Sequence, residues 1–452
     1  MAGVNAAVLE PPRTKAAPAP AYKWLVVLML WSICFFNYAD RQAIFSVFPK
    51  LTGEFGFDKF QLGLIGSAFM WAYAFGAPVA GFIADRVRRK DLILGGCVFW
   101  SAITALTGWC GNLWQFIFVR GLEGLGETFY FPASLSLASD YHGPKTRSRA
   151  LALHQSGVYI GTIAGSWAGA WFAEKMGWRA GFYFFGIAGA LLALALYKLL
   201  REPRRGEADA ADDSPGASKR ISAEPLSLAE TLRAIFRAPA ALLLMAAFLG
   251  ANFVAAIFLA WTPTFLVEKF GFKLVAAGLS GSAFIHLASA VSVPIAGLLA
   301  DRLVRRLAGG RMVVQALGLL VGAVFVFLVG MTSDVRTLLV AMACFGFCKG
   351  FYDSNIFASL YDLIEPRARA TATGLMNTVG WSGGALGPVY VGWAARHFGQ
   401  GSEMANMSVA IAWSGAVYLA GAALLLGAIF LLSRSAAFMP LQPQNFRDHQ
   451  TS

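Results

Sequence analysis

Charged residues are scarce in this chain. They make up 14% of its 452 residues, whereas hydrophobic residues make up 57%. A soluble domain carries about 25% charged residues, so this deficit excludes a chain built only of soluble domains. Apolar windows of about 20 residues recur along the sequence, and each is long enough to cross a bilayer as a helix. The composition therefore predicts an all-α polytopic membrane protein.

Cysteine and histidine are also rare, with five residues of each. Their spacing matches no metal-binding or redox motif, and an intramembrane enzyme needs a nucleophile with its base or a metal cluster. We therefore expect no enzyme activity, no cofactor and no metal site. A signalling sensor is disfavoured because the polar segments are too short for an additional soluble domain. His154 and His286 lie within apolar windows, where each can be a packing residue or a functional group.

Twelve apolar windows predict twelve transmembrane helices. The windows are 24–48, 61–84, 91–110, 113–139, 150–173, 180–200, 239–267, 274–300, 312–331, 335–361, 370–395 and 405–433. We expect five regions: a disordered cytoplasmic leader (1–22), an N-terminal six-helix bundle (23–200), a cytoplasmic linker (201–238), a C-terminal six-helix bundle (239–433) and a cytoplasmic tail (434–452). Within the linker, residues 226–236 predict a short amphipathic helix that lies on the inner leaflet.

A net charge of +12 is compatible with nucleic-acid binding, but the positions of the basic residues favour a membrane topology. Of the 37 Lys and Arg residues, 26 fall on the side of the membrane that holds both termini, eight fall on the other side, and three lie within spans. Basic residues accumulate on the cytoplasmic side of membrane proteins. We therefore expect a multi-pass protein of the inner (plasma) membrane, with both termini in the cytoplasm and no nucleic-acid partner.

Two short motifs recur in the second half of the chain. Residues 81–90 read G-F-I-A-D-R-V-R-R-K, and residues 297–306 read G-L-L-A-D-R-L-V-R-R. The segment R-S-R-A at 147–150 is followed in the same way by R-A-R-A at 367–370. Because both motifs recur after nearly the same interval, these two independent matches indicate an internal duplication of a six-helix unit.

Glycine recurs at every fourth position of the fifth window, a small-residue stripe that lets two helices approach closely. These glycines are Gly157, Gly161, Gly165 and Gly169. The eleventh window carries a looser stripe of Gly380, Gly383, Gly384 and Gly387. Both stripes predict tight helix packing.

Ionisable side chains interrupt two apolar windows. Asp40 and Arg41 lie in the first window, and Arg120, Glu123 and Glu127 lie in the fourth. At about 100° per residue, the three charged residues of the fourth window fall within about 60° of one another on one helix face. A charge at the bilayer centre costs at least about 2.5 kcal/mol, so these faces must look at a protein interior or a water-filled cavity.

The pairing of acids with arginines indicates proton and anion chemistry. A buried carboxylate can be neutral in one environment and ionised beside a cation, which makes Asp40 and Glu127 candidate proton carriers. Arg41 and Arg120 offer forks of donors that suit a carboxylate, and protonation of an internal acid would free an arginine for a substrate anion. Glu123 can titrate as well, or it can simply neutralise Arg120 at i and i+3.

The tenth window contains a second charged pair, Lys349 and Asp353, one helical turn apart. The pair can be self-neutralised and placed for packing, or it can face a cavity from the C-terminal half together with Tyr352 and Asn355, because burying an ion pair for stability alone is costly. Three further aromatic residues are candidates for stacking on a substrate or hydrogen bonding to it. They are Tyr38, Tyr73 and Trp381.

The motifs identify a resemblance to a known family. The loop at 81–90 is similar to the G-x-x-A-D-R-x-G-R-R signature of the major facilitator superfamily, although Arg88 replaces the usual glycine. The patterns N-Y-x-D-R and R-x-x-x-G-x-G-E-x-x-x-F-P resemble the anion:cation symporter family within it. These patterns fall on Asn37, Tyr38, Asp40 and Arg41, and on Arg120, Gly124, Gly126, Glu127, Phe131 and Pro132.

The resemblance implies a major facilitator fold with two six-helix repeats and proton-coupled symport of a small organic anion, such as a sugar acid or other carboxylate, by alternating access. Spans 1, 4, 7 and 10 should line the central cavity. Asp40 and Glu127 would carry protons, and Arg41 and Arg120 would organise the substrate site with Asn37. The superfamily's cytoplasmic gate would fall on Asp85, Arg86, Arg89, Asp140, Asp301 and Arg302.

A second resemblance leads to a different substrate. Spinster-type lysolipid and sphingolipid carriers share N-Y-x-D-R and G-x-G-E but usually lack the following F-P, so Phe131 and Pro132 favour the anion symporters. Drug efflux is a third alternative, and the arginines beside carboxylates argue for anions instead. We expect the partners to be a small organic anion, a proton and the lipid bilayer, and the protein to be a monomer.

Overall fold

A computed structural model describes residues 20–84, 86–203, 228–307, 309–365, 368–399 and 401–438. Within these ranges the chain forms helices joined by short turns and contains no strand, which confirms the predicted all-α class. The predicted leader up to residue 19, most of the linker and the end of the tail lie outside the described residues.

The helices of the first half are α1 (Pro20–Ser46), α2 (Phe48–Phe55), α3 (Lys59–Ala84), α4 (Arg89–Thr107), α5 (Leu113–Glu127), α6 (Tyr130–Tyr141), α7 (Pro144–Lys175) and α8 (Trp178–Leu199). Those of the second half are α10 (Leu228–Phe236), α11 (Pro239–Phe270), α12 (Leu274–Val304), α13 (Gly310–Met331), α14 (Val335–Asp353), α15 (Ile356–Leu363), α16 (Arg369–His397) and α17 (Glu403–Phe438). The predicted amphipathic linker helix is present as α10.

Each of the twelve predicted windows is helical, but the fourth and the tenth are each broken into two helices, α5 with α6 and α14 with α15. Nine spans in the described part of the chain are long and apolar enough to cross a membrane. The α5–α6 segment, α7 and α16 fall short of that measure. The charges inside α5 explain the first of these cases, because three ionisable residues lower its apolarity.

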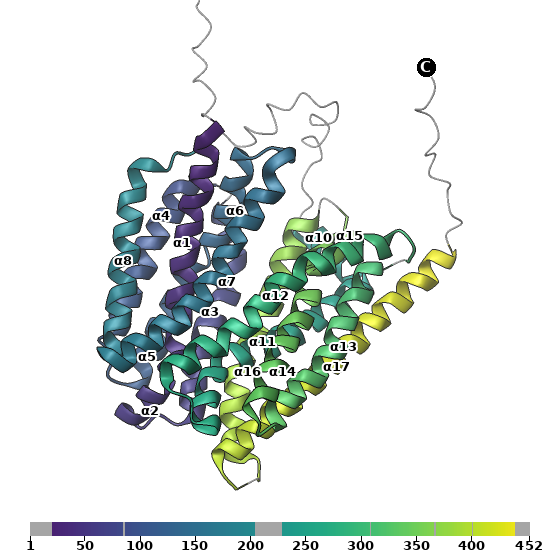
Figure 1. Cartoon of the computed structure of the whole chain (residues 1–452). Helices are drawn as coiled ribbons and strands as arrows, with labels where there is room; N and C mark the ends of the chain where they lie inside the picture. Colours follow the sequence, from purple (N-terminus) through teal and green to yellow (C-terminus); the bar gives the residue numbers. More distant parts are fainter. Residues whose placement is uncertain are drawn as a thin grey trace, which may run out of the picture.

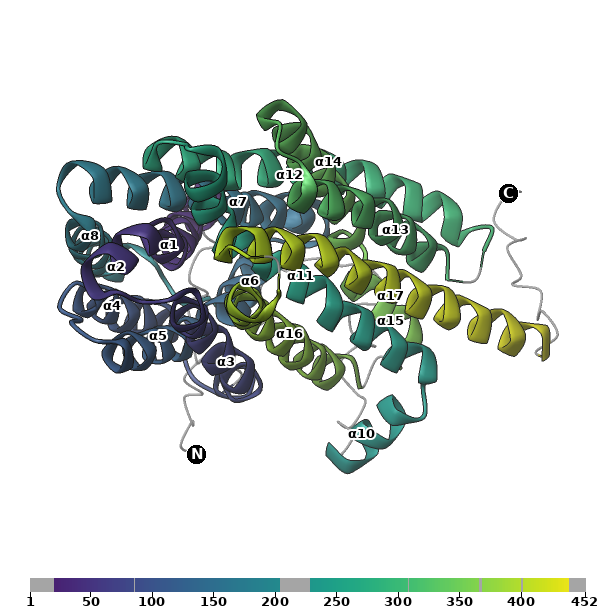
Figure 2. The same ribbon diagram turned by 90° about the horizontal axis from the view of Figure 1, so that it is seen from below.

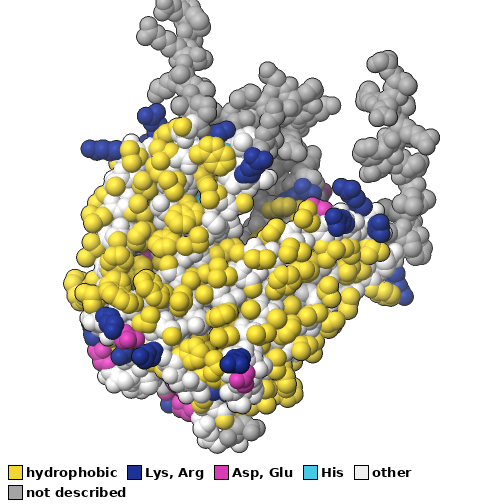
Figure 3. Space-filling view, viewed as in Figure 1, with side chains coloured by type: hydrophobic (Ala, Val, Ile, Leu, Met, Phe, Trp, Pro, Cys, Tyr) yellow, Lys and Arg dark blue, Asp and Glu magenta, His cyan; other side chains and the backbone are white. Residues whose placement is uncertain are grey.

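The helices form two bundles that lie side by side (Figure 1). The bundles meet at the end that holds α2 and diverge toward the end where α8 stops and α11 starts, which we call the linker end. Figure 3 shows hydrophobic side chains over the middle of this face and charged side chains at its two ends. A protein whose apolar sides face lipid and whose ends face water has this distribution.

Glycine stripes fix the packing inside each bundle. The α7 glycines lie against the α1 backbone: a Cβ atom added at Gly161 would come within 2.5 Å of the Phe35 carbonyl oxygen. In the second bundle, α16 packs on α11 in the same way, and a Cβ at Gly387 would come within 2.5 Å of the Phe253 carbonyl oxygen. The predicted tight packing is confirmed, and both contacts join helices of the same bundle.

Contacts between the two bundles concentrate near α2. Helices α3 and α16 run side by side at the junction (Figure 2), and α7 packs on α12. Lys59 Nζ lies 2.7 Å from Glu268 and 3.6 Å from Glu403, both in the second bundle, and Arg396 pairs with Asp58 at 2.9 Å. These ion pairs close the α2 end.

Candidate functional site

A cavity of about 160 Å³ lies between the two bundles. It is lined by α1, α3, α5 and α7 of the first bundle and by α11, α12, α14 and α16 of the second. The predicted spans 1, 4, 7 and 10 correspond to α1, α5, α11 and α14, so the lining includes all four and adds four more helices. Among the described residues of the lining, Arg41, Arg120 and Lys349 are basic and none is acidic.

Arg41 joins α1 to α5 in the interior. Its Nε donates to Glu127 Oε2 at 2.9 Å, and a second guanidinium nitrogen pairs with the same oxygen. Nη2 also donates to Asn37 Oδ1 at 3.2 Å. The guanidinium lies 4.4 Å from the Tyr38 ring centre and 4.6 Å from that of Phe69, within the range of cation–π attraction. Arg41 is thus held in place and also lines the cavity.

Arg120 and Glu123 form a separate pair on α5. Arg120 Nη1 donates to Glu123 Oε2 at 2.6 Å, which is the i, i+3 contact that helix geometry predicts. Arg120 Nη2 also approaches the carbonyl oxygen of Arg41 at 3.5 Å, so the two arginines are neighbours. Arg120 is part of the cavity lining and Glu123 is not, although both side chains are buried.

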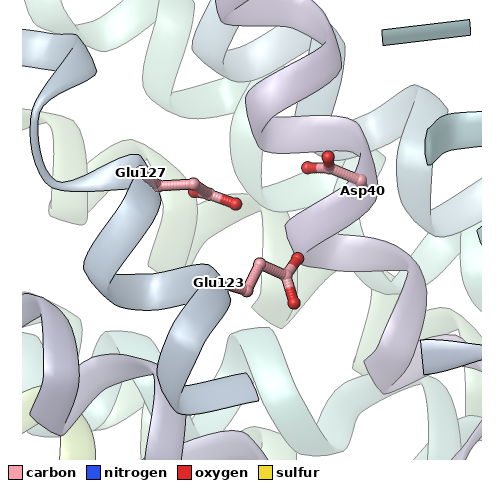
Figure 4. Close-up of side chains that lie close together, drawn as sticks. All are labelled: Asp40, Glu123 and Glu127. Atoms are coloured by element: carbon pink, nitrogen blue, oxygen red, sulfur yellow. The ribbon is translucent and has the colours of Figure 1, made fainter. Parts of the chain in front are cut away.

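Asp40 pairs with neither arginine side chain. Its carboxylate accepts the backbone N–H of Arg41 at 2.7 Å and the hydroxyl of Thr104, on α4, at 3.2 Å. Carboxylate oxygens of Asp40, Glu123 and Glu127 lie within 4.8 Å of one another. Figure 4 shows these three side chains, from α1 and α5, pointing into one shared space. Glu123 Oε1 and Glu127 Oε1 are buried and accept no hydrogen bond from the described residues.

Three carboxylates at this spacing could together hold one small cation. Two guanidinium groups already lie beside them, which leaves an excess of one negative charge when all five groups are ionised. That excess suits a monovalent charge, and a divalent ion would overcompensate it. The prediction that the protein uses no metal cofactor stays a prediction.

On the opposite wall, Lys349 of α14 lines the cavity and forms an ion pair with Asp353. His286 of α12 lines the cavity as well, and its Nδ1 has no partner among the described groups. Tyr352, predicted to face the substrate, is instead packed inside the second bundle with 1% of its surface exposed, and its carbonyl oxygen accepts from Gln315 on α13. Asn355 is also buried, and its amide donates to Ser354.

The predicted aromatic residues lie close to Arg41. Trp381 of α16 lines the cavity, and its ring centre is 4.4 Å from that of Tyr73 of α3. The Arg41 guanidinium is 5.4 Å from the Tyr73 ring and 5.6 Å from the Trp381 ring. Tyr73 therefore lies behind Trp381, and the two rings bridge the bundles.

Several polar residues of the lining were not selected from the sequence. They are Gln42, Thr162, Asn252 and Ser282. Gln42 directly follows Arg41 and donates to the Leu259 carbonyl oxygen of the second bundle at 3.0 Å. Its position directly after an intramembrane charge is the sequence signal that could have identified Gln42. Isolated amides and hydroxyls in apolar windows are too common to single out the other three.

Some of the predicted gate residues form a partly buried ion pair, and the other described ones are exposed. Arg89, at the start of α4, forms an ion pair with Asp140 at the end of α6 and a 3.0 Å contact with Glu202. Asp85 lies outside the described residues, and Arg86 and Arg302 are exposed. Asp301 is exposed and lies 3.7 Å from Arg311.

Arg311 and Asp362 form an ion pair at 2.5 Å that repeats the pair of Arg89 and Asp140. Arg311 follows Arg89 by the same interval as Asp362 follows Asp140, and this interval is close to that of the two sequence motifs. Applying the repeat interval to Arg89 and Asp140 would have found this second pair in the sequence.

Comparisons with known proteins agree with this architecture. The sequence profile of the Major Facilitator Superfamily matches residues 30–388 and 282–450. The solved structure titled as a bacterial homolog to the human lysosomal transporter Spinster, in an inward-facing and unoccupied conformation, superposes with a TM-score of 0.75. Its sequence is 22% identical, and the match covers 94% of this chain and 100% of that one. This likeness shows the fold alone.

Curated relatives include proteins named as anion transporters and as spinster proteins. The chain is 28% identical over 401 residues to the "Sodium-dependent phosphate transport protein 1, chloroplastic" of Arabidopsis thaliana, with 87% of this chain and 78% of the relative covered. It is 28% identical over 377 residues to the "Probable L-galactonate transporter" of Escherichia coli (strain K12), with 81% and 82% covered. It is 30% identical over 254 residues to "Protein spinster homolog 1" of Homo sapiens, with 56% and 47% covered.

The profile match spans most of the chain, and the described residues form two helical bundles around a central cavity. Together these findings show that the chain belongs to the Major Facilitator Superfamily of multi-pass membrane transporters.

Proposed function

We propose that the protein is a secondary active transporter that carries a small organic anion together with a proton by alternating access. One observation carries the proposal: Arg41 and Arg120 line the cavity, while the acids that hold them, Glu127 and Glu123, lie behind them. The cavity therefore presents guanidinium donors to a solute, and these donors suit a carboxylate. Relatives named for L-galactonate and phosphate support an anionic solute.

Proton coupling follows from the shared position of the acids. When Glu127 takes up a proton, its charge no longer holds Arg41, and the guanidinium can bind the carboxylate of the solute. When the proton leaves, Glu127 competes with the solute for Arg41 and favours release. Asp40 lies within the same group of oxygens, so the proton can be shared between the two acids as it moves.

Transport would proceed by movement of the two bundles (23–200 and 239–433) against each other. The ion pairs of Lys59 and Asp58 close the α2 end, so the described conformation would open toward the linker end. The basic linker end would face the cytoplasm, as the distribution of Lys and Arg indicates. In this scheme Arg89 and Asp140 help to hold the cytoplasmic ends of their helices during the movement.

Uptake into proteoliposomes tests the coupling. An imposed pH gradient should drive accumulation of sugar acids by the wild-type protein, and Glu127→Gln should abolish the accumulation while solute exchange at equal pH continues. Glu123→Gln is the matched control, because it removes the same charge one helical turn away from Glu127, at the residue that neutralises Arg120. Equal loss in both variants, or accumulation that requires a Na⁺ gradient instead, would contradict proton coupling through Glu127.

A spinster-type lipid carrier is the second candidate. It is supported by the 30% identity to human spinster homolog 1 and by apolar side chains on both sides of the cavity, such as Phe69 and Phe258. The same liposomes can be loaded with fluorescent lysophospholipid. Movement of the lipid without uptake of any organic acid would replace the anion proposal with this one.

A further inference from the structure

We propose that the cavity contains a second anion-binding group, formed on the C-terminal bundle by Lys349 with His286, and that the preferred substrate is a small dicarboxylate. This inference rests on the proposed anion transport and deepens it. A monocarboxylate would engage only the two arginines of the first bundle, whereas a dicarboxylate would also reach the lysine of the second.

Lys349 is placed to receive an anion. Lys349 lines the cavity, whereas its counter-ion Asp353 is not part of the described lining, so the basic member of the pair is the one that borders the solute space. His286 lines the cavity beside it, and His286 Nδ1 is a buried ring nitrogen without a partner among the described groups. The His286 ring centre lies 5.9 Å from that of Tyr159, and Lys349 interacts electrostatically with both rings.

The pair of Lys349 and Asp353 is easier to separate than the pair on the opposite wall. The side chains of Lys349 and Asp353 are 17% and 34% exposed, whereas those of Arg41 and Glu127 are 7% and 0% exposed. Asp353 is the more exposed partner, so releasing Lys349 to a solute would leave a less deeply buried charge unpaired than releasing Arg41 would. A substrate carboxylate can therefore take the place of Asp353.

The internal repeat gives independent support. Helices α5 and α14 begin after equivalent capping residues, Asn112 and Asp334. The ion pairs near the ends of the helices that follow them, Asp140 on α6 and Asp362 on α15, are separated by the same interval as the caps. Lys349 follows Glu127 by this interval as well, so the repeat places a cation in the second bundle where the first bundle carries an acid. The two bundles thus carry different chemistry at matching positions, since Lys349 lines the cavity and Glu127 does not.

A dicarboxylate that contacts Arg41 or Arg120 at one end and Lys349 at the other would link the two bundles. Its binding energy would then depend on the distance between the bundles, which is the quantity that alternating access changes. A solute with one carboxylate lacks this link. Lys349 would thus make the binding of a dicarboxylate, and not of a monocarboxylate, depend on the distance between the two bundles.

Binding of gluconate and glucarate to the purified protein tests the inference, since these six-carbon acids differ by one terminal carboxylate. The wild type should bind glucarate more tightly than gluconate. In Lys349→Gln/Asp353→Asn, which removes both charges of the pair, the ratio of the two dissociation constants should fall by at least about tenfold, as expected for loss of a charged hydrogen bond. Lys349→Arg should restore most of the preference.

Asp353→Asn supplies a second readout that does not remove the lysine. Lys349 then lacks its internal partner, so the preference for glucarate should increase. A purely structural role for the pair would change both dissociation constants alike and leave their ratio constant, which would overturn the inference. Gluconate binding without any preference for glucarate would overturn the second group alone, whereas failure to bind or transport any carboxylate would overturn the anion-transport proposal itself.

Discussion

Helices α5 and α14 occupy equivalent places in the two bundles but carry different chemistry. Both begin at a side-chain cap and both form the first part of a broken span. At the interval that separates their caps, Arg120, Glu123 and Glu127 of α5 correspond to Met342, Phe345 and Lys349 of α14. The caps, the end-of-helix ion pairs and the glycine contacts are shared by the two bundles, whereas the buried charges of α5 are not. The two bundles therefore share one helical framework but differ in the charged residues that it carries.

The two charged pairs also differ in burial. Arg41 and Glu127 are almost completely enclosed, whereas Lys349 and Asp353 are partly exposed. A charge that loses its partner in a closed interior costs far more free energy than one that water can reach. The first bundle should therefore tolerate changes to its pair much less well than the second.

The largest expected effect comes from unpairing the acids. Arg41→Met leaves Glu127 buried without its cation and should lower the free energy of unfolding by about 3–5 kcal/mol. Lys349→Met leaves Asp353 partly exposed and should cost about 1 kcal/mol or less. Denaturant titration of the two detergent-solubilised variants measures both values. The double variant Arg41→Met/Glu127→Gln is the control and should recover most of the loss; equal losses for the two single variants would show that burial does not distinguish the bundles.

A smaller difference is expected at the paired ion contacts of the linker end. Arg89 is 2% exposed and contacts Asp140, Glu202 and the Ser136 hydroxyl, whereas Arg311 is 22% exposed. Arg89→Gln should therefore cost about 1–3 kcal/mol of unfolding free energy because it removes several charged hydrogen bonds. Arg311→Gln should change it by less than about 1 kcal/mol. The same titration compares them, and a larger cost for Arg311→Gln would reverse the assignment of the tighter contact to the first bundle.

The smallest effect concerns the helix caps. The backbone N–H and hydroxyl of Thr337 both donate to Asp334 at 2.8 Å, which lowers the pKa of that carboxyl below its usual value. Because the folded pKa is the lower one, the stabilisation is present above the unfolded value of about 3.9. It is lost as the pH falls through the folded pKa.

Asn112, the equivalent cap of α5, accepts from the Gln115 N–H at 3.0 Å and does not titrate. Asp334→Asn should therefore remove a small acid-dependent decrease in Tm, and Asn112→Asp should add one. Thermal unfolding between about pH 6 and pH 3 measures both, with the wild type as reference. An unchanged pH profile in both variants would mean that the caps contribute nothing measurable.

Local helix geometry explains which contacts could be predicted from the sequence. Arg120 with Glu123 and Lys349 with Asp353 are separated by three and four residues, so a helix brings each pair together whatever surrounds it. The twelve windows and the glycine stripes could be predicted for the same reason, because each depends on spacing along one segment. The repeat could be predicted because two segments share the same motifs.

Contacts between segments could not be predicted in this way. The sequence left open which arginine holds Glu127, and the partner proved to be Arg41, 86 residues away. It also placed Tyr352 beside the substrate, whereas α14 turns that side chain toward the interior of its bundle. Both outcomes depend on the rotation of a helix about its axis, which packing against neighbouring helices sets and local sequence does not.

The sequence by itself determined that the protein lies in a membrane, that it is built from a repeated unit, and that charged faces of two helices must avoid lipid. The tertiary structure alone decided that three acids converge behind the cavity wall while three cations border the cavity. The physical reason is that helix periodicity fixes neighbours within one turn, whereas the depth of a side chain in a bundle depends on how closely glycine-lined helices approach one another.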